Sequence, residues 1–119
     1  MADPTPALTA ARSLVNPWDP RIIAAYNQNK VFVAYAKGEF PWHEHPETDD
    51  LFLVLEGELQ IDLPDRTVTL AANDLFVVPK GTRHRPRSEH GARLLIIEPR
   101  DTPNTGDPTT AAPERWYLR

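Results

Sequence analysis

The 13 prolines of this 119-residue chain crowd towards its two ends. Proline fixes φ and removes a backbone donor, so proline-rich segments rarely form long helices or central strands. We therefore expect residues 1–29 to form an irregular N-terminal arm and residues 101–119 an irregular C-terminal tail, on either side of one body, residues 30–100. Within the arm, Asp19 and Pro20 fit the start of one short helix over 21–26, with Asp19 as its N-cap.

The body is predicted to consist of short strands. Its apolar runs are rich in β-branched and aromatic residues, which favour extended structure, and turn residues separate them. The runs are 31–35, 51–55, 59–63, 67–70, 75–78 and 94–97. Short strands at this spacing are typical of an all-β antiparallel sandwich or barrel. Glu56-Gly57, between two neighbouring runs, predicts a hairpin of 51–55 with 59–63.

Two of these runs, 51–55 and 94–97, are apolar on both faces of the expected strand. A strand with one face in water alternates apolar and polar residues, so something must cover the outer face of these two. The N-terminal arm or a second subunit could cover it. We favour a second subunit, with the arm contributing, and therefore expect a homodimer.

Composition excludes several classes of function. The formal net charge of −4 and the pI near 5.5 argue against a nucleic-acid partner or an acidic membrane surface, because both attract basic proteins. The absence of cysteine excludes disulfides and thiolate ligands. The longest apolar run, 51–55, is far shorter than the roughly 18 residues of a membrane span, and the first residues lack secretory-signal features. We therefore expect a cytoplasmic protein.

Three of the four histidines form a pattern with one aspartate. His43 and His45 are separated by one residue, so both rings project from the same face of an extended strand. Asp50 follows at the start of an apolar run, and His84 lies far along the chain. Imidazole nitrogens and a carboxylate suit one divalent transition metal ion such as zinc, iron, nickel or manganese. Taken alone, such a histidine pair also fits ordinary surface or core histidines of a β-protein.

Two segments resemble the motifs of the cupin family. GEFPWHEHPETDDLFLVLEG resembles the first motif, G-x5-H-x-H-x3,4-E-x6-G, and NDLFVVPKGTRHRPRS resembles the second, G-x5-P-x-G-x2-H-x3-N. Pro79, Gly81 and His84 are in register with the second motif. The resemblance covers about residues 30–100 and is closest to small single-domain cupins labelled mannose-6-phosphate-isomerase-like.

The sequence departs from these motifs at four positions. Lys37 stands where the first glycine is expected, Asn73 replaces the second motif's leading glycine, and Ser88 replaces its closing asparagine. These three positions affect turns and shape. The fourth departure is Asp50, which is one methylene shorter than the usual glutamate and could bind a metal directly, through water, or not at all.

The resemblance implies a double-stranded β-helix, or jelly roll, in which His43, His45 and His84 bind one metal ion inside the barrel. The carboxylate position falls on Asp50. Its neighbour Asp49 fits the spacing from His45 but not the count to Gly57, and would lie on the opposite strand face.

Phe52 shares the strand face of Asp50, so it is a candidate for the wall of a substrate pocket. His90 lies in a turn and is placed outside the site. The function expected from this set is a metalloenzyme that acts on a small oxygenated substrate as an isomerase, a lyase or a dioxygenase. The alternative is a non-catalytic cupin that binds a small ligand, with a structural metal or none.

Overall fold

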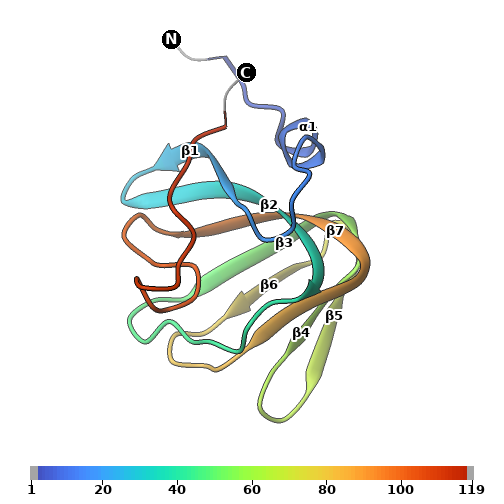
Figure 1. Ribbon diagram of the computed structural model, residues 1–119, viewed down its shortest axis with the longest axis vertical. Helices are drawn as coiled ribbons and strands as arrows, with labels where there is room; N and C mark the ends of the chain where they lie inside the picture. The colour runs from blue at the N-terminus through green and yellow to red at the C-terminus, as the bar shows by residue number, and fades with distance from the viewer. Residues whose placement is uncertain (1–2, 118–119) are drawn as a thin grey trace.

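The computed structural model describes residues 3–117, which form one short helix and seven strands (Figure 1). The elements are α1 (Ala7–Arg12), β1 (Arg21–Tyr26), β2 (Asn29–Glu39), β3 (Asp50–Gly57), β4 (Leu59–Asp62), β5 (Thr67–Leu70), β6 (Leu75–Val78) and β7 (Arg85–Pro99). No helix in this described part of the chain is long and apolar enough to cross a membrane.

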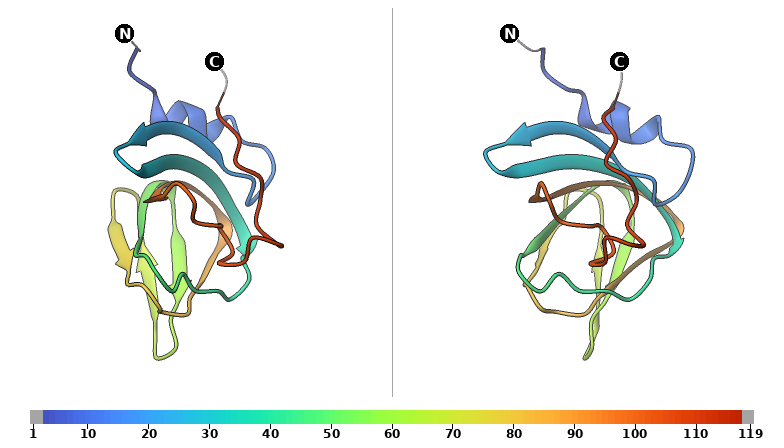
Figure 2. Two further views of the ribbon diagram at one scale, coloured as in Figure 1. Left: turned by 90° about the vertical axis from the view of Figure 1, so that its left-hand side faces the viewer. Right: turned by 60° about the vertical axis from the view of Figure 1, so that its left-hand side comes forward.

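The strands pair antiparallel into one strongly bent sheet that encloses the core. Its path runs β1-β2-β7-β3-β6, and β4 pairs with β5 and with the first residues of β7. The long strand β7 therefore joins both halves of the sheet, and Figure 2 shows the halves facing each other across the interior. This arrangement confirms the all-β jelly roll predicted from the sequence.

The predicted hairpin of 51–55 with 59–63 is wrong. β3 pairs with β6 and β7, whereas β4 pairs with β5 and with residues 85–87 of β7. The reason lies at Gly57, which has a φ of 87° and lies so close to β7 that a Cβ there would be 2.4 Å from the Gly91 carbonyl oxygen. The chain therefore continues past Gly57 along the same edge of β7, from residues 92–97 to residues 85–87, instead of folding back along β3.

The predicted helix over 21–26 is also wrong, because these residues form β1. β1 pairs with β2 across a turn in which Asn27 has a φ of 54°. Ile22 is buried in the main core, and Ile23 packs beside α1. Sheet pairing and the burial of two β-branched side chains outweigh the local N-cap signal of Asp19.

The arm and the tail close two sides of the barrel. Ala10 and Ala11 of α1 pack against Val33 on the outer face of β2, and Figure 2 shows the helix lying over β1 and β2. The segment after β7 crosses one end of the barrel and returns beside β1 (Figure 2). There the Ile22 N–H donates to the Arg115 carbonyl oxygen at 2.7 Å.

Candidate metal centre

The fold brings the three histidines and Asp50 together inside the barrel. His43 and His45 lie between β2 and β3, Asp50 is the first residue of β3, and His84 directly precedes β7. All four residues are buried. One potential ligand atom from each residue lies within 4.8 Å of the others. The four residues named from the sequence therefore form one compact cluster.

Backbone hydrogen bonds fix the segments that carry the histidines. The His43 N–H donates to the His84 carbonyl oxygen at 3.0 Å, and the His84 N–H donates to the His43 carbonyl oxygen at 2.9 Å. The Gly81 N–H donates to the His45 carbonyl oxygen at 2.9 Å. The ring centroids of His43 and His84 are consequently only 4.2 Å apart. Two segments that are distant in the sequence are thus held side by side.

Two of the rings are oriented through their Nδ1 atoms. His43 Nδ1 lies 2.9 Å from the Pro41 carbonyl oxygen, and His84 Nδ1 lies 2.9 Å from the Thr82 carbonyl oxygen. A carbonyl oxygen only accepts, so each Nδ1 carries the proton and each Nε2 keeps its lone pair. Metal-binding histidines are commonly oriented by such a bond from the second ring nitrogen.

Several polar atoms of the cluster are buried with no hydrogen-bond partner among the described residues. They are both ring nitrogens of His45, His84 Nε2 and Asp50 Oδ1. Asp50 Oδ2 lies 3.4 Å from His45 Nε2 and 4.0 Å from His84 Nε2. An unpartnered buried polar atom costs about 1–3 kcal/mol, so a group of them in one place is costly unless a cation joins them. Three imidazoles and a carboxylate fit a divalent transition metal ion.

Burial also sets the protonation of the cluster. Loss of hydration, together with a smaller effect of the nearby His84, lowers the pKa of His43 to about 3. Burial likewise lowers the pKa of His45 and of His84. The same loss of hydration raises the pKa of Asp50 to about 6. At neutral pH the three imidazoles are therefore neutral and Asp50 is ionised, which is the protonation state that a metal ion requires.

The other titratable residues considered from the sequence lie elsewhere. The Asp49 carboxylate is exposed and accepts a hydrogen bond from the Lys80 N–H at 2.9 Å, so it closes a turn at the rim. His90 is exposed at a bend within β7, beside Glu89. The structure therefore brings Asp50 to the histidines and leaves Asp49 and His90 outside the cluster.

A small cavity of about 40 Å³ adjoins His43 and Asp50. Phe52 is 3% exposed, forms part of its wall, and approaches His84 edge-on with ring centroids 6.3 Å apart. The rest of the lining is mostly apolar and comprises Trp18, Pro20, Phe32, Ala34, Phe40, Pro86, Ile96, Glu98 and Asn104. The free volume admits roughly three water-sized atoms beside the cluster.

Sequence reasoning missed Glu98 and Lys30, which face each other across β7 and β2. Glu98 is 2% exposed, and its Oε1 atom lies 3.5 Å from Lys30 Nζ. Burial, followed by the charge of Asp50, raises the pKa of Glu98 to about 9. The sequence pattern could have identified Glu98 as a buried carboxylate, because alternation places it on the same strand face as the buried Leu94 and Ile96.

Comparison with known proteins identifies the family of this chain. The family described as cupin domain matches residues 31–98, more than half of the chain. The uncharacterized protein YdbB of Bacillus subtilis (strain 168) is 52% identical over 77 residues, which are 64% of this chain and 68% of YdbB. The crystal structure of a cupin-2 domain containing protein from Shewanella frigidimarina is 42% identical, with a TM-score of 0.72, and the match covers 73% of this chain and 85% of that one.

A longer relative has a named activity. Quercetin 2,3-dioxygenase of Bacillus subtilis (strain 168) is 36% identical over 67 residues. The match covers 55% of this chain but only 20% of that enzyme. Because the cupin domain model matches more than half of the chain, the chain belongs to the cupin family.

Proposed function

We propose that His43, His45, His84 and Asp50 hold one divalent transition metal ion and that the protein is a metalloenzyme for a small oxygenated substrate. The observation that carries this proposal is the group of buried, unpartnered nitrogen and oxygen atoms that converge from three separate segments. Zinc, iron, nickel and manganese all accept this donor set.

The residues around the cluster have separate roles in this proposal. When bound, the ion would polarise an oxygen of the substrate as a Lewis acid or take part in oxygen chemistry. The Nδ1 bonds of His43 and His84 fix both rings and leave each Nε2 atom unprotonated, and His84 Nε2 lies 4.0 Å from Asp50 Oδ2. Phe52, Phe40 and Trp18 form part of the apolar wall of the adjoining cavity.

Three reaction classes fit a metal and a small oxygenated substrate: isomerisation, elimination by a lyase and dioxygenation. The similarity to quercetin 2,3-dioxygenase supports dioxygenation as the first class to test. The small cavity beside the cluster supports a substrate whose reacting end is slender. The alternative is a cupin that binds such a molecule without turnover.

The test is to purify the protein without a tag or added metal, measure its metal content, and assay the metal-loaded protein for oxygen uptake and for isomerisation of small hydroxyketones. Stoichiometric metal with turnover supports the enzyme. Stoichiometric metal with ligand-dependent thermal stabilisation and no turnover supports the binding protein. Protein that binds no divalent metal ion contradicts both.

We also propose that the protein is a homodimer through the outer face of β3, β6 and β7. Leu51 pairs with Val77 and Ile97, and Leu53 pairs with Leu75 and Leu95, so these side chains share one face of the sheet. Leu75 is 57% exposed and Val77 is 39% exposed. A contiguous apolar face is typical of a protein–protein contact, and a second copy would supply a matching apolar face about a twofold axis.

A further inference from the structure

The C-terminal residues 101–117, here called the capping segment, close the barrel next to the histidine cluster. They are tied at their far end to β1, where the Tyr117 N–H donates to the Ile22 carbonyl oxygen at 2.8 Å. Midway, Gly106 lies so close to Glu44 that a Cβ on it would be 2.1 Å from the Glu44 carbonyl oxygen. Glu44 stands between His43 and His45, so the capping segment rests on the loop that carries both histidines.

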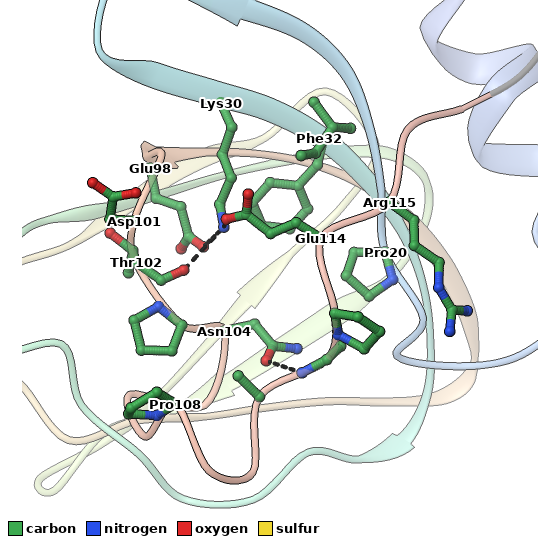
Figure 3. Close-up of a pocket in the computed structure, with 15 residues that line it drawn as sticks. Pro20, Lys30, Phe32, Glu98, Asp101, Thr102, Asn104, Pro108, Glu114 and Arg115 are labelled. Carbon is green, nitrogen blue, oxygen red and sulfur yellow. Dashed lines mark hydrogen bonds and ion pairs between the residues drawn. The ribbon is translucent and has the colours of Figure 1, made fainter.

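A second cavity, of about 270 Å³, lies beneath the capping segment (Figure 3). It shares four lining residues with the small cavity beside the cluster, namely Pro20, Phe32, Glu98 and Asn104. The two cavities therefore meet at these residues. A molecule in the larger cavity would extend its end past them towards His43 and Asp50.

Two polar groups occupy this junction. The Asn104 Oδ1 atom accepts a hydrogen bond from the Ala112 N–H at 2.9 Å, which fixes the amide. No described residue accepts a hydrogen bond from its Nδ2, and Figure 3 shows Asn104 inside the ring of lining residues. Glu98 Oε1 is buried without a hydrogen-bond partner among the described residues. The junction thus offers one donor group and one carboxyl oxygen to a ligand.

The larger cavity has no uncommitted cation among its lining residues. Lys30 Nζ donates to the Thr102 carbonyl oxygen at 2.9 Å and to Glu114 Oε1 at 2.7 Å. Arg115, the other cation of the lining, forms an ion pair with Asp19 Oδ1 at 3.8 Å, and Figure 3 shows its guanidinium pointing away from the cavity. Three carboxyl groups also line the cavity, those of Glu98, Asp101 and Glu114. A phosphate or carboxylate on the ligand would find no free positive partner here.

We infer that the two cavities form one binding site for a small neutral polyhydroxy or hydroxycarbonyl compound, with Asn104 as its specificity-determining contact. The inference rests on the proposed function, because the metal would bind one oxygen of the ligand while the Asn104 amide donates to another. Asn104 lies outside residues 31–98, the part that matches the family, so this contact belongs to the chain's own capping segment.

The test uses the full chain labelled with ¹⁵N and loaded with zinc, and dihydroxyacetone as the probe. The expected result is that dihydroxyacetone shifts the side-chain NH₂ resonances of Asn104. Asn104→Asp keeps the oxygen that accepts from Ala112 but removes both donors, so we expect its dissociation constant for the probe to rise about tenfold. Asn16→Asp makes the same charge change on the exposed arm and leaves the constant unchanged.

Dihydroxyacetone phosphate tests the charge argument, and we expect it to bind at least about tenfold more weakly than dihydroxyacetone. The inference is overturned if zinc binds but the Asn104 resonances stay fixed at saturating probe, if Asn104→Asp binds like Asn16→Asp, or if the phosphorylated probe binds better. Protein that takes up no zinc overturns the proposed function instead, so the two failures are distinguishable.

Discussion

His43 and His84 exchange both of their backbone hydrogen bonds, at 3.0 and 2.9 Å, although they belong to segments far apart in the sequence. Each ring then donates its Nδ1 proton to the carbonyl oxygen two residues earlier, that of Pro41 or of Thr82. The same local geometry on both segments leaves an unprotonated Nε2 atom on each ring. The backbone bridge, rather than side-chain packing alone, is what brings the two ligands together.

His84→Ala should lower the affinity for zinc by about 100-fold or more, because loss of a ligand exceeds the 10–100-fold cost of losing a residue that merely orients one. Competition with a chromophoric chelator measures this affinity. His90→Ala is the matched control, since His90 is exposed and outside the cluster. Equal zinc loss in the two variants would contradict the proposed site.

The cluster could be named from the sequence because two segments resemble the cupin motifs, and that resemblance implies one metal site for His43, His45, His84 and Asp50. One residue between His43 and His45 sets both side chains on one side of an extended segment. Asp50 begins β3 opposite Val78, so its side chain faces the interior. Whether the short Asp50 side chain comes close to the histidines could not be predicted from the sequence. The distance depends on where β3 begins, and not on the residue type alone.

Other features depend on contacts between distant segments. The route of the chain at Gly57 follows from its close approach to Gly91, which no local pattern of β3 and β4 reveals. β1 forms a strand because β2 is beside it, against the helix signal of Asp19. Asn104 lines the cavity because of the path that the capping segment takes. The residues next to it in the sequence therefore do not predict this position.

Gly57→Ala should lower the free energy of unfolding by about 3 kcal/mol or more, because the new Cβ meets the Gly91 carbonyl oxygen at 2.4 Å in a left-handed backbone conformation. Gly38→Ala is the control, because Gly38 also has a positive φ, of 78°, but there is open space around the added Cβ. Its cost should be only about 1–2 kcal/mol. Urea denaturation of the metal-free protein measures both losses, and equal losses would show that the close approach of Gly57 to Gly91 does not restrict this position.

Val77→Glu should convert the proposed homodimer to a monomer, because it places a charge on the apolar face of β6 that a second copy would bury. Light scattering should give twice the 13.5 kDa chain mass for the wild type and the single mass for the variant. Thr69→Glu changes an exposed residue of β5 and should remain dimeric. A wild type that is monomeric at micromolar concentration would refute the proposed dimer.

Asp50→Asn should weaken zinc binding at least about tenfold while stabilising the metal-free protein. Burial raises the pKa of Asp50 to about 6 from an ordinary value of 3.8, so the unfolded chain ionises first as the pH rises. The free energy of unfolding of the metal-free protein therefore falls as the pH rises between these two pKa values. The asparagine removes this cost at pH 7.5. Asp49→Asn, at the exposed rim, should change neither zinc affinity nor stability in this way.

The pH dependence of zinc affinity should reflect Asp50 rather than the histidines. Burial lowers the pKa of all three imidazoles, that of His43 to about 3, so in the folded protein they do not take up protons near their ordinary value of 6.5. Asp50, with a pKa of about 6, is the first of the four to compete for the ion as the pH falls. Affinity should therefore be level from pH 8 to about 6 and then fall about tenfold per unit, the slope of a single proton. Competition with a chelator across this pH range measures the slope. In Asp50→Asn, the pH at which zinc affinity begins to fall should be lower than in the wild type. A steeper fall that begins at 6.5 in both proteins would show that the histidines titrate as exposed imidazoles, and would contradict the buried cluster.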